Sequence, residues 1–126
     1  QAVMAGRAPI SNGDGQQSRD FTYVANAVQA NLRALFTERD EALNEVYNIA
    51  IGQRTSVLEL YEMICELGGA YHAPQFGPPR AGDVRHSLAD ISKARHYLGY
   101  EPEVTVRQGL EKVWAWFGGA KVKQQV

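Results

Sequence analysis

The segment Phe76-Gly77-Pro78-Pro79-Arg80-Ala81-Gly82-Asp83-Val84-Arg85-His86 is the stretch around which the remaining sequence is organised. Its two adjacent prolines fix φ and have no N–H to donate, so we expect no regular element before Arg80, while Gly82 allows the backbone to turn. A stiff loop of this kind can offer Arg80 to a phosphate and Asp83 to a pair of hydroxyl groups. On these residues alone, an ion pair on the protein surface is the simpler interpretation. The rest of the sequence is needed to choose between an ion pair and a ligand-binding loop.

The composition is that of an ordinary globular protein. The chain has 126 residues, of which 44% are hydrophobic and 21% charged, with a net charge of −1. This indicates one domain spanning residues 1–126, gives no reason to expect a nucleic-acid partner, and leaves no apolar run near the roughly 18 residues needed to span a membrane. Cys65 is the only cysteine, so an intrachain disulfide is excluded. Residues 1–10 lack the apolar core of a signal peptide, and the cytoplasm is the expected location.

The N-terminal region predicts a β-hairpin. Residues 1–10 have no clear period and look like the beginning of a piece cut from a longer protein. Asn12-Gly13-Asp14-Gly15 contains two overlapping turn signals, and residues 16–24 end in the aromatic and β-branched residues typical of a strand. Together these segments predict a hairpin that places Arg19 on its far side.

Helical periodicity recurs in several parts of the chain. The expected helices cover residues 26–37, 57–67, 91–98 and 106–117. We expect Asn26 to cap the first of them, whereas Ser56-Val57-Leu58-Glu59 and Thr105-Val106-Arg107-Gln108 have the form of capping boxes at the second and fourth. Asp90 should cap the third helix, and Gly99 should end it.

Further segments have strand-like sequences. Residues 46–51 form a short run rich in β-branched residues, and Gly52 stops it, which indicates a buried strand. Asn48 in the middle of this run either makes a structural hydrogen bond, which is the simpler interpretation, or points toward a ligand. Residues 71–76 should be extended, and residues 84–88 should form a short strand. The expected fold is a mixed α/β structure of about four helices and several short strands.

Most signatures of catalysis are missing from the sequence. There is no phosphate-binding lysine loop, and Gly13-Asp14-Gly15 lacks the third glycine and the following helix of a dinucleotide fingerprint. The histidines show no metal-ligand spacing with one another or with Cys65, so we expect no metal site, and Cys65 should be a small buried hydrophobe. The residues by themselves leave Arg19 and Arg80 as an anion-binding pair on two loops.

Three separated segments resemble a known family. They are residues 12–24, Asn-Gly-Asp-Gly-Gln-Gln-Ser-Arg-Asp-Phe-Thr-Tyr-Val, residues 46–50, Val-Tyr-Asn-Ile-Ala, and residues 80–94, Arg-Ala-Gly-Asp-Val-Arg-His-Ser-Leu-Ala-Asp-Ile-Ser-Lys-Ala. In order and spacing they are similar to the extended short-chain dehydrogenases that epimerise nucleotide sugars, and especially to UDP-N-acetylglucosamine 4-epimerases. The resemblance implies the α/β carboxy-terminal substrate-binding portion of such a Rossmann-type enzyme, without the N-terminal dinucleotide-binding core.

The resemblance also implies roles for individual residues. In that family the arginine of Ser-Arg-Asp-Phe and the arginine of Arg-x-Gly-Asp bind the UDP pyrophosphate, while the aspartate of Arg-x-Gly-Asp meets the ribose hydroxyls. These positions are Arg19, Arg80 and Asp83 here, and Asn12 is a weaker candidate for a nucleotide contact. The family usually has an acidic residue where this chain has Ala25, so a capping or polar interaction is expected to be missing.

Family members bind NAD through a glycine-rich loop and move protons with a Tyr-x-x-x-Lys pair, and this sequence contains neither. The resemblance therefore implies that this chain is the part that binds the UDP-sugar, either UDP-GlcNAc/UDP-GalNAc or UDP-Glc/UDP-Gal. Without the N-terminal NAD-binding domain, it is expected to be inactive and to bind no NAD. It also implies a homodimeric parent enzyme. Residues 46–51 would normally pair with strands of the other domain, so their free edge favours self-association.

Two alternatives stay open. A related nucleotide-sugar dehydratase, decarboxylase or reductase would use a similar scaffold, and a non-catalytic nucleotide-binding module would carry the same loop. The residues around the sugar are expected to come largely from the other domain, so the sequence does not specify the hexose.

Overall fold

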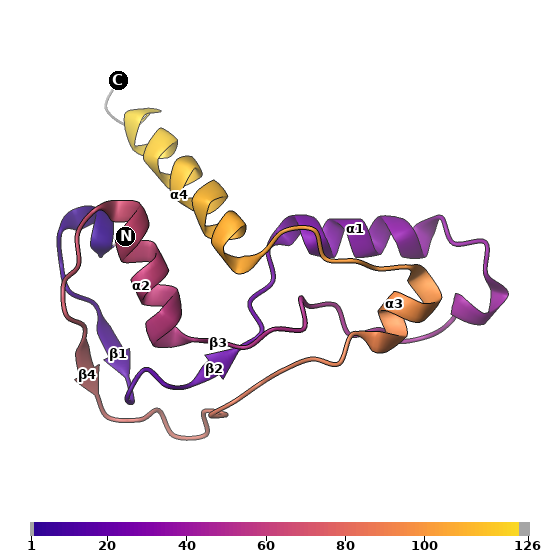
Figure 1. The fold of residues 1–126 in the computed structure, drawn as a ribbon, viewed down its shortest axis with the longest axis horizontal. Coiled ribbons are helices and arrows are strands. Elements are labelled where there is room, and N and C mark those ends of the chain that lie inside the picture. The colour runs from indigo at the N-terminus through magenta and orange to yellow at the C-terminus, as the bar shows by residue number, and fades with distance from the viewer. Residues whose placement is uncertain (1, 124–126) are drawn as a thin grey trace. The chain divides into compact units, whose positions relative to one another are not determined.

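The computed structural model describes residues 2–123, which divide into two compact units (Figure 1). The first unit contains the described residues up to Arg19, residues 55–87 and those from Leu110 onward, and the second contains residues 20–54 and 88–109. The elements, in chain order, are η1 (Val3–Ala5), β1 (Ile10–Asn12), β2 (Ser18–Arg19), α1 (Val24–Leu35), η2 (Asp40–Ala42), β3 (Thr55–Ser56), α2 (Val57–Gly68), β4 (Gln75–Gly77), α3 (Ser92–Leu98) and α4 (Val106–Lys123). The mixed α/β fold class is confirmed.

The strands of the first unit do not form the predicted N-terminal hairpin. Strand β1 pairs in parallel with β4, and β2 pairs antiparallel with β3. The Asn-Gly-Asp-Gly stretch does turn the chain, with Gly13 and Gly15 both at positive φ. After the turn, however, the carbonyls of Gly15 and Gln17 accept from the first N–H groups of α2, and β2 therefore meets β3. The hairpin prediction was wrong because both strands have better partners far along the chain.

Helix α2 follows its local sequence signals closely. Ser56 and Glu59 form the predicted capping box, in which the Ser56 hydroxyl accepts from the Glu59 N–H at 3.1 Å and the Glu59 carboxylate accepts from the Ser56 N–H at 2.7 Å. The helix ends at Gly69, whose φ of 69° is left-handed. Cys65 is 4% exposed inside this helix, which confirms that it packs as a small hydrophobe.

The second unit has a core of small side chains around one tyrosine. Its buried members are Ala30, Ala42, Ala50, Ile91, Ala94, Leu98 and Tyr100. Tyr100 is completely buried and donates its hydroxyl proton to the Ala50 carbonyl at 2.8 Å. Gly99 ends α3 as predicted, and the Asp90 carboxylate accepts from the Ser92 N–H at 2.8 Å, although the helix begins one residue later than expected.

Asn26 is not the cap of α1. The helix already begins at Val24, so residues 21–24 are not a strand, and it ends at Leu35, before the predicted position. Asn26 is 1% exposed. Its amide group donates to the Val104 carbonyl and accepts from the N–H groups of Glu103 and Val104, at 2.8 to 3.1 Å. A buried amide that serves three main-chain groups replaces the capping role that the sequence pattern suggested.

Residues 46–51 form no strand in the described part of the chain. The Asp20 carboxylate accepts from the N–H groups of Ile51 and Gly52, at 3.1 and 3.0 Å, which gives the end of the segment side-chain partners instead of a ladder. Asn48 is exposed and donates to the Asp90 carbonyl at 3.3 Å, as the structural interpretation expects. The strand predicted at residues 84–88 is reduced to one bridge between His86 and Ser18.

Helix α4 begins with the predicted capping box. The Gln108 N–H donates to the Thr105 hydroxyl, and the Thr105 N–H donates to the Gln108 side-chain oxygen at 3.0 Å. The aromatic side of this helix is only partly covered, because Trp114 is half-buried near Gly68 of α2 while Trp116 is 68% exposed.

Candidate functional site

A groove of about 460 Å³ lies in the first unit between the turn that follows β1 and the loop that follows β4. Its lining residues fall within positions 12–17 and 76–85. The groove therefore includes the proline-rich loop that the sequence singled out, and the elements that position it belong to one compact unit.

The parallel pairing of β1 and β4 brings these two segments together. Asn12, the last residue of β1, is opposite Gly77, the last residue of β4, and the Gly13 N–H continues the pairing by donating to the Gly77 carbonyl. Both loops leave their strands at the same edge of the pair. Residues that are about 65 positions apart in the sequence thus form opposite walls of one groove.

Arg80 and Asp83 occupy the two ends of a tight turn. The Asp83 N–H donates to the Arg80 carbonyl at 3.2 Å, and Gly82 has a φ of 76°, a left-handed conformation that favours glycine. The prediction that Gly82 turns the backbone between the guanidinium and the carboxylate is confirmed. Both side chains line the groove.

Arg19 joins the site through Asp83. One guanidinium nitrogen, Nη2, lies 2.5 Å from Asp83 Oδ1, and the other, Nη1, donates to the Ser18 carbonyl at 2.8 Å. The two side chains are 30% and 39% exposed, so the ion pair is partly shielded from water. The structure therefore brings together two residues that the sequence placed on separate loops.

A second ion pair, which the sequence reasoning missed, crosses the groove. Arg85 Nη2 lies 2.8 Å from Asp14 Oδ2, and both side chains are more than half exposed. The Gln16 backbone N–H and the Arg85 guanidinium lower the pKa of Asp14 below its ordinary value of 3.8, so this carboxyl is ionised at neutral pH. Arg85 lies in the proline-rich segment 76–86 that the sequence singled out, but no sequence signal connected it with Asp14.

The two ion pairs leave one guanidinium unbalanced. Within residues 2–123, Arg80 has no hydrogen-bond or ion-pair partner for its exposed side chain. The groove and its edge thus hold three guanidinium groups against two carboxylates, and the excess positive charge belongs to Arg80. An anionic ligand would find its charge partner there without breaking an existing ion pair.

The remaining predicted site residue, Asn12, also lines the groove. Its main-chain carbonyl accepts from Gln17 Nε2 at 2.8 Å, which fixes the Gln17 side chain along the same wall. No tyrosine, lysine, histidine or cysteine is among the lining residues of this groove. The lining therefore offers guanidinium, carboxylate and amide groups, but no imidazole, thiol, phenol or amine.

Residues 2–123 contain no group of three or more His, Cys, Asp or Glu side chains that could hold a metal ion. The same residues contain no helix long and apolar enough to cross a membrane.

Comparison with known proteins gives consistent results. The UDP-glucose 4-epimerase of Thermotoga maritima, solved with UDP-glucose, has a TM-score of 0.86 and 37% identity over 94% of this chain and 37% of its own. A UDP-N-acetylglucosamine 4-epimerase from Methanobrevibacter ruminantium, in complex with UDP-N-acetylmuramic acid, has a TM-score of 0.84 and 32% identity over 94% of this chain and 37% of its own. The UDP-glucuronic acid 4-epimerase of Bacillus cereus, with UDP-glucuronic acid and NAD, has a TM-score of 0.80 and 31% identity over 87% of this chain and 36% of its own.

This chain spans little more than a third of the length of the curated relatives that it matches, and the matched part is their carboxy-terminal part. The GDP-mannose 4,6 dehydratase family matches residues 1–113. The chain therefore belongs to this family of nucleotide-sugar epimerases and dehydratases, as the three sequence motifs indicated.

Proposed function

We propose that residues 1–126 are the UDP-sugar-binding portion of an NAD-dependent nucleotide-sugar 4-epimerase, acting on the pair UDP-GlcNAc/UDP-GalNAc or UDP-Glc/UDP-Gal. The observation that carries this proposal is the unpaired guanidinium of Arg80, in a groove whose other charges are already balanced. Several similar enzymes bind UDP-sugars, as their structures with these ligands record.

The pyrophosphate would bind between Arg80 and Arg19. Arg80 is free to make a forked pair of hydrogen bonds to phosphate oxygens. Arg19 has five N–H donors, of which the Asp83 carboxylate and the Ser18 carbonyl take only some, so it can hold Asp83 and a phosphate together. Asp83 Oδ2, which has no partner among the described residues, would accept from the ribose hydroxyls, and the Asn12 side chain would contact the nucleotide.

NAD would be held by another part of the enzyme. The described residues offer no glycine-rich loop that opens a helix, and the groove contains no tyrosine–lysine pair, so they do not fit a dinucleotide or its proton transfers. We therefore propose that this chain is inactive alone and works with a cofactor-binding portion, in what we call the full-length protein. Other statements remain predictions from the sequence. They are that the full-length protein is a homodimer located in the cytoplasm, and that this chain is a single substrate domain with no nucleic-acid partner.

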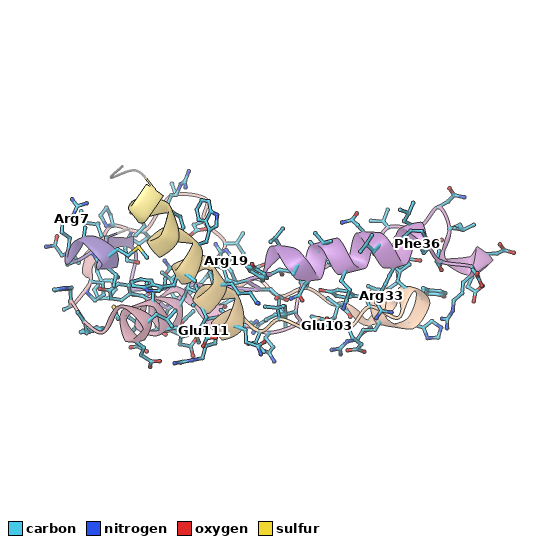
Figure 2. The ribbon with its side chains drawn as sticks, turned by 90° about the horizontal axis from the view of Figure 1, so that it is seen from above. Arg7, Arg19, Arg33, Phe36, Glu103 and Glu111 are labelled. Atoms are coloured by element: carbon cyan, nitrogen blue, oxygen red, sulfur yellow. The ribbon has the colours of Figure 1, made fainter. Side chains whose placement is uncertain are left out.

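Calorimetry of UDP binding to the full-length protein tests this proposal through Arg80→Ala. A hydrogen bond to a charged group contributes roughly 1.5–3 kcal/mol, so the variant should bind UDP and UDP-sugar about 10- to 150-fold more weakly. Arg7→Ala is the matched control, because Arg7 is an exposed arginine of the same unit outside the groove (Figure 2). Equal UDP affinity in Arg80→Ala and in the unaltered protein would reject the pyrophosphate site.

A further inference from the structure

A hydrogen bond between Ser18 and His86 lies beside the Arg19–Asp83 ion pair, and neither residue lines the groove. The Ser18 hydroxyl oxygen is 2.9 Å from His86 Nδ1. Ser18 is 6% exposed, whereas His86 reaches the surface. The imidazole has no other hydrogen-bond partner among residues 2–123, so Ser18 is the group that orients it. With the ring proton on Nε2, the hydroxyl donates and Nδ1 accepts.

Ser18 also joins the segment of residues 85–87 to β2 through its main chain. Its N–H donates to the Arg85 carbonyl at 2.9 Å, and its carbonyl accepts from the Ser87 N–H at 3.1 Å. The same carbonyl accepts from Arg19 Nη1 at 2.8 Å. A shift of segment 85–87 along β2 would therefore disturb an acceptor that holds the Arg19 guanidinium.

The register between this segment and β2 has little main-chain support. The pairing of Ser18 with His86 is a single bridge, where a strand would form a ladder. Val84, two residues before His86, is 61% exposed, so apolar packing within the described residues does not anchor the segment. The hydrogen bond from the Ser18 side chain to the imidazole is thus the contact that adds to the bridge and fixes the register.

The Arg19 guanidinium depends on this register because its acceptors come from both segments. Nη1 bonds to the Ser18 carbonyl of β2 and lies 3.5 Å from the Arg85 carbonyl. Nη2 lies 2.5 Å from Asp83 Oδ1, in the loop that follows β4. All of these residues belong to the first unit. If the two segments slide or separate, the guanidinium loses one set of acceptors or the other.

We propose that His86 is a positioning residue of the UDP site, because its hydrogen bond to Ser18 holds β2 against segment 85–87 and so orients Arg19 toward the pyrophosphate. This inference rests on the proposed function, in which Arg19 binds a phosphate. His86 itself is absent from the lining of the groove. Its substitution should therefore weaken binding through Arg19 and leave the contribution of Arg80 intact.

Calorimetry of UDP binding to the full-length protein tests the role of Nδ1. His86→Ala should bind UDP about 3- to 10-fold more weakly, as expected for the loss of one neutral hydrogen bond. His86→Asn, whose amide takes the place of Nδ1, should restore the affinity to within about twofold, whereas His86→Gln, whose amide reaches the place of Nε2, should not. The control is His96→Ala, which removes an exposed histidine of the second unit and should leave the affinity unchanged. Unaltered affinity in His86→Ala, or equal losses in His86→Ala and His86→Asn, would overturn the proposal.

A double-mutant cycle separates positioning from a general structural effect. In an Arg19→Ala background, His86→Ala should change UDP affinity by less than about 1.5-fold, because the guanidinium that it positions is gone. In an Arg80→Ala background, the loss should stay at about 3- to 10-fold. The same loss in both backgrounds would show that His86 supports the loop as a whole, and would refute its action through Arg19.

Amide exchange distinguishes the failure of this inference from the failure of the proposed function. In the ligand-free full-length protein, His86→Ala should speed exchange of the Ser87 N–H, which donates to the Ser18 carbonyl, by at least about threefold. Unchanged exchange would overturn the positioning role whether or not UDP binds. Faster exchange in a protein that does not bind UDP would reject the proposed function and leave the bond between Ser18 and His86 as the contact that fixes the register. UDP binding that depends on Arg80 but not on His86 would do the reverse.

Discussion

The Arg19–Asp83 ion pair makes a double-mutant cycle informative, because Asp83 has two proposed partners. Its Oδ1 lies 2.5 Å from the Arg19 guanidinium, and its Oδ2, which has no partner among residues 2–123, is the proposed acceptor for the ribose hydroxyls. Asp83→Asn should remove charge-assisted acceptance from ribose and also loosen Arg19, whose other hydrogen bond at normal length goes to the Ser18 carbonyl. We expect UDP to bind roughly 5- to 20-fold more weakly to this variant, the equivalent of about 1–1.8 kcal/mol.

Inorganic pyrophosphate separates the two contributions, since it has no ribose. Loosening Arg19 should cost about 0.5–1 kcal/mol, the upper part of the range for exposed ion pairs, because this pair is partly shielded from water. Removing the Asp83 charge also reduces its repulsion of the phosphates, which at about 6 Å in a water-like dielectric contributes roughly 0.7 kcal/mol in the opposite direction. The two effects nearly cancel, so pyrophosphate affinity should change less than about threefold in Asp83→Asn.

The cancellation disappears when Arg19 is absent. In an Arg19→Ala background, Asp83→Asn has no guanidinium to loosen, and pyrophosphate should bind about threefold more tightly because only the reduced repulsion remains. Calorimetry of the full-length protein, the two single variants and the double variant gives the coupling free energy, which we expect to be about 0.5–1 kcal/mol. If the effects of the two substitutions on pyrophosphate binding add within about 0.3 kcal/mol, Asp83 does not position Arg19 and the reasoning is refuted.

Three further predictions concern the second unit and the acidic groups. Asn26→Ala leaves three main-chain groups without partners and should lower the free energy of unfolding by roughly 2–4 kcal/mol in urea titrations, whereas the exposed Asn31→Ala in the same helix should change it by less than about 0.5 kcal/mol. Tyr100→Phe removes a buried hydroxyl from the Ala50 carbonyl and should cost about 1–2 kcal/mol by the same assay; no change would show that water replaces the bond. Hydrogen bonds lower the pKa of three carboxyl groups, those of Asp14, Glu59 and Asp90. Their stabilisation is therefore complete above the ordinary values of 3.8 to 4.5 and is lost as the pH falls through the lowered ones, so the unfolding temperature should be flat near neutrality and decrease below about pH 4.5.

Local signals in the sequence predicted the helices well. The capping boxes at Ser56 and Thr105 and the stop at Gly99 depend on residues within one turn of each other, and the structure contains all three. The interactions that the sequence could not show connect distant positions. Asn26 bonds to residues 77 and 78 positions away, so a side chain that looked like a helix cap instead holds a remote loop.

The candidate site shows the same difference between what local sequence predicts and what depends on contacts between distant residues. Resemblance to a family placed Arg19, Arg80, Asp83 and Asn12 at one site, and the structure gathers them around one groove. The arrangement of charges within it was not predictable, because the two ion pairs join positions 64 and 71 residues apart. Sequence reasoning found which residues carry charge, but only the two ion pairs seen in the structure leave Arg80 as the unbalanced guanidinium.

Two of the strand predictions that failed did so for different physical reasons. The residues of the predicted hairpin pair with other strands, because Ile10–Asn12 pairs with β4 and Ser18–Arg19 pairs with β3. In residues 46–50 the strand-like sequence and the alternating burial are present, yet the N–H groups have no partner in the described residues. The hairpin prediction chose the wrong partners for strands that do form, whereas the segment 46–50 has strand-like sequence but no pairing strand within residues 2–123. Helix α1 shows a similar mismatch, because its apolar residues have the regular spacing of a buried helix face and yet are 50–74% exposed; these residues are Val24, Val28, Leu32, Leu35 and Phe36.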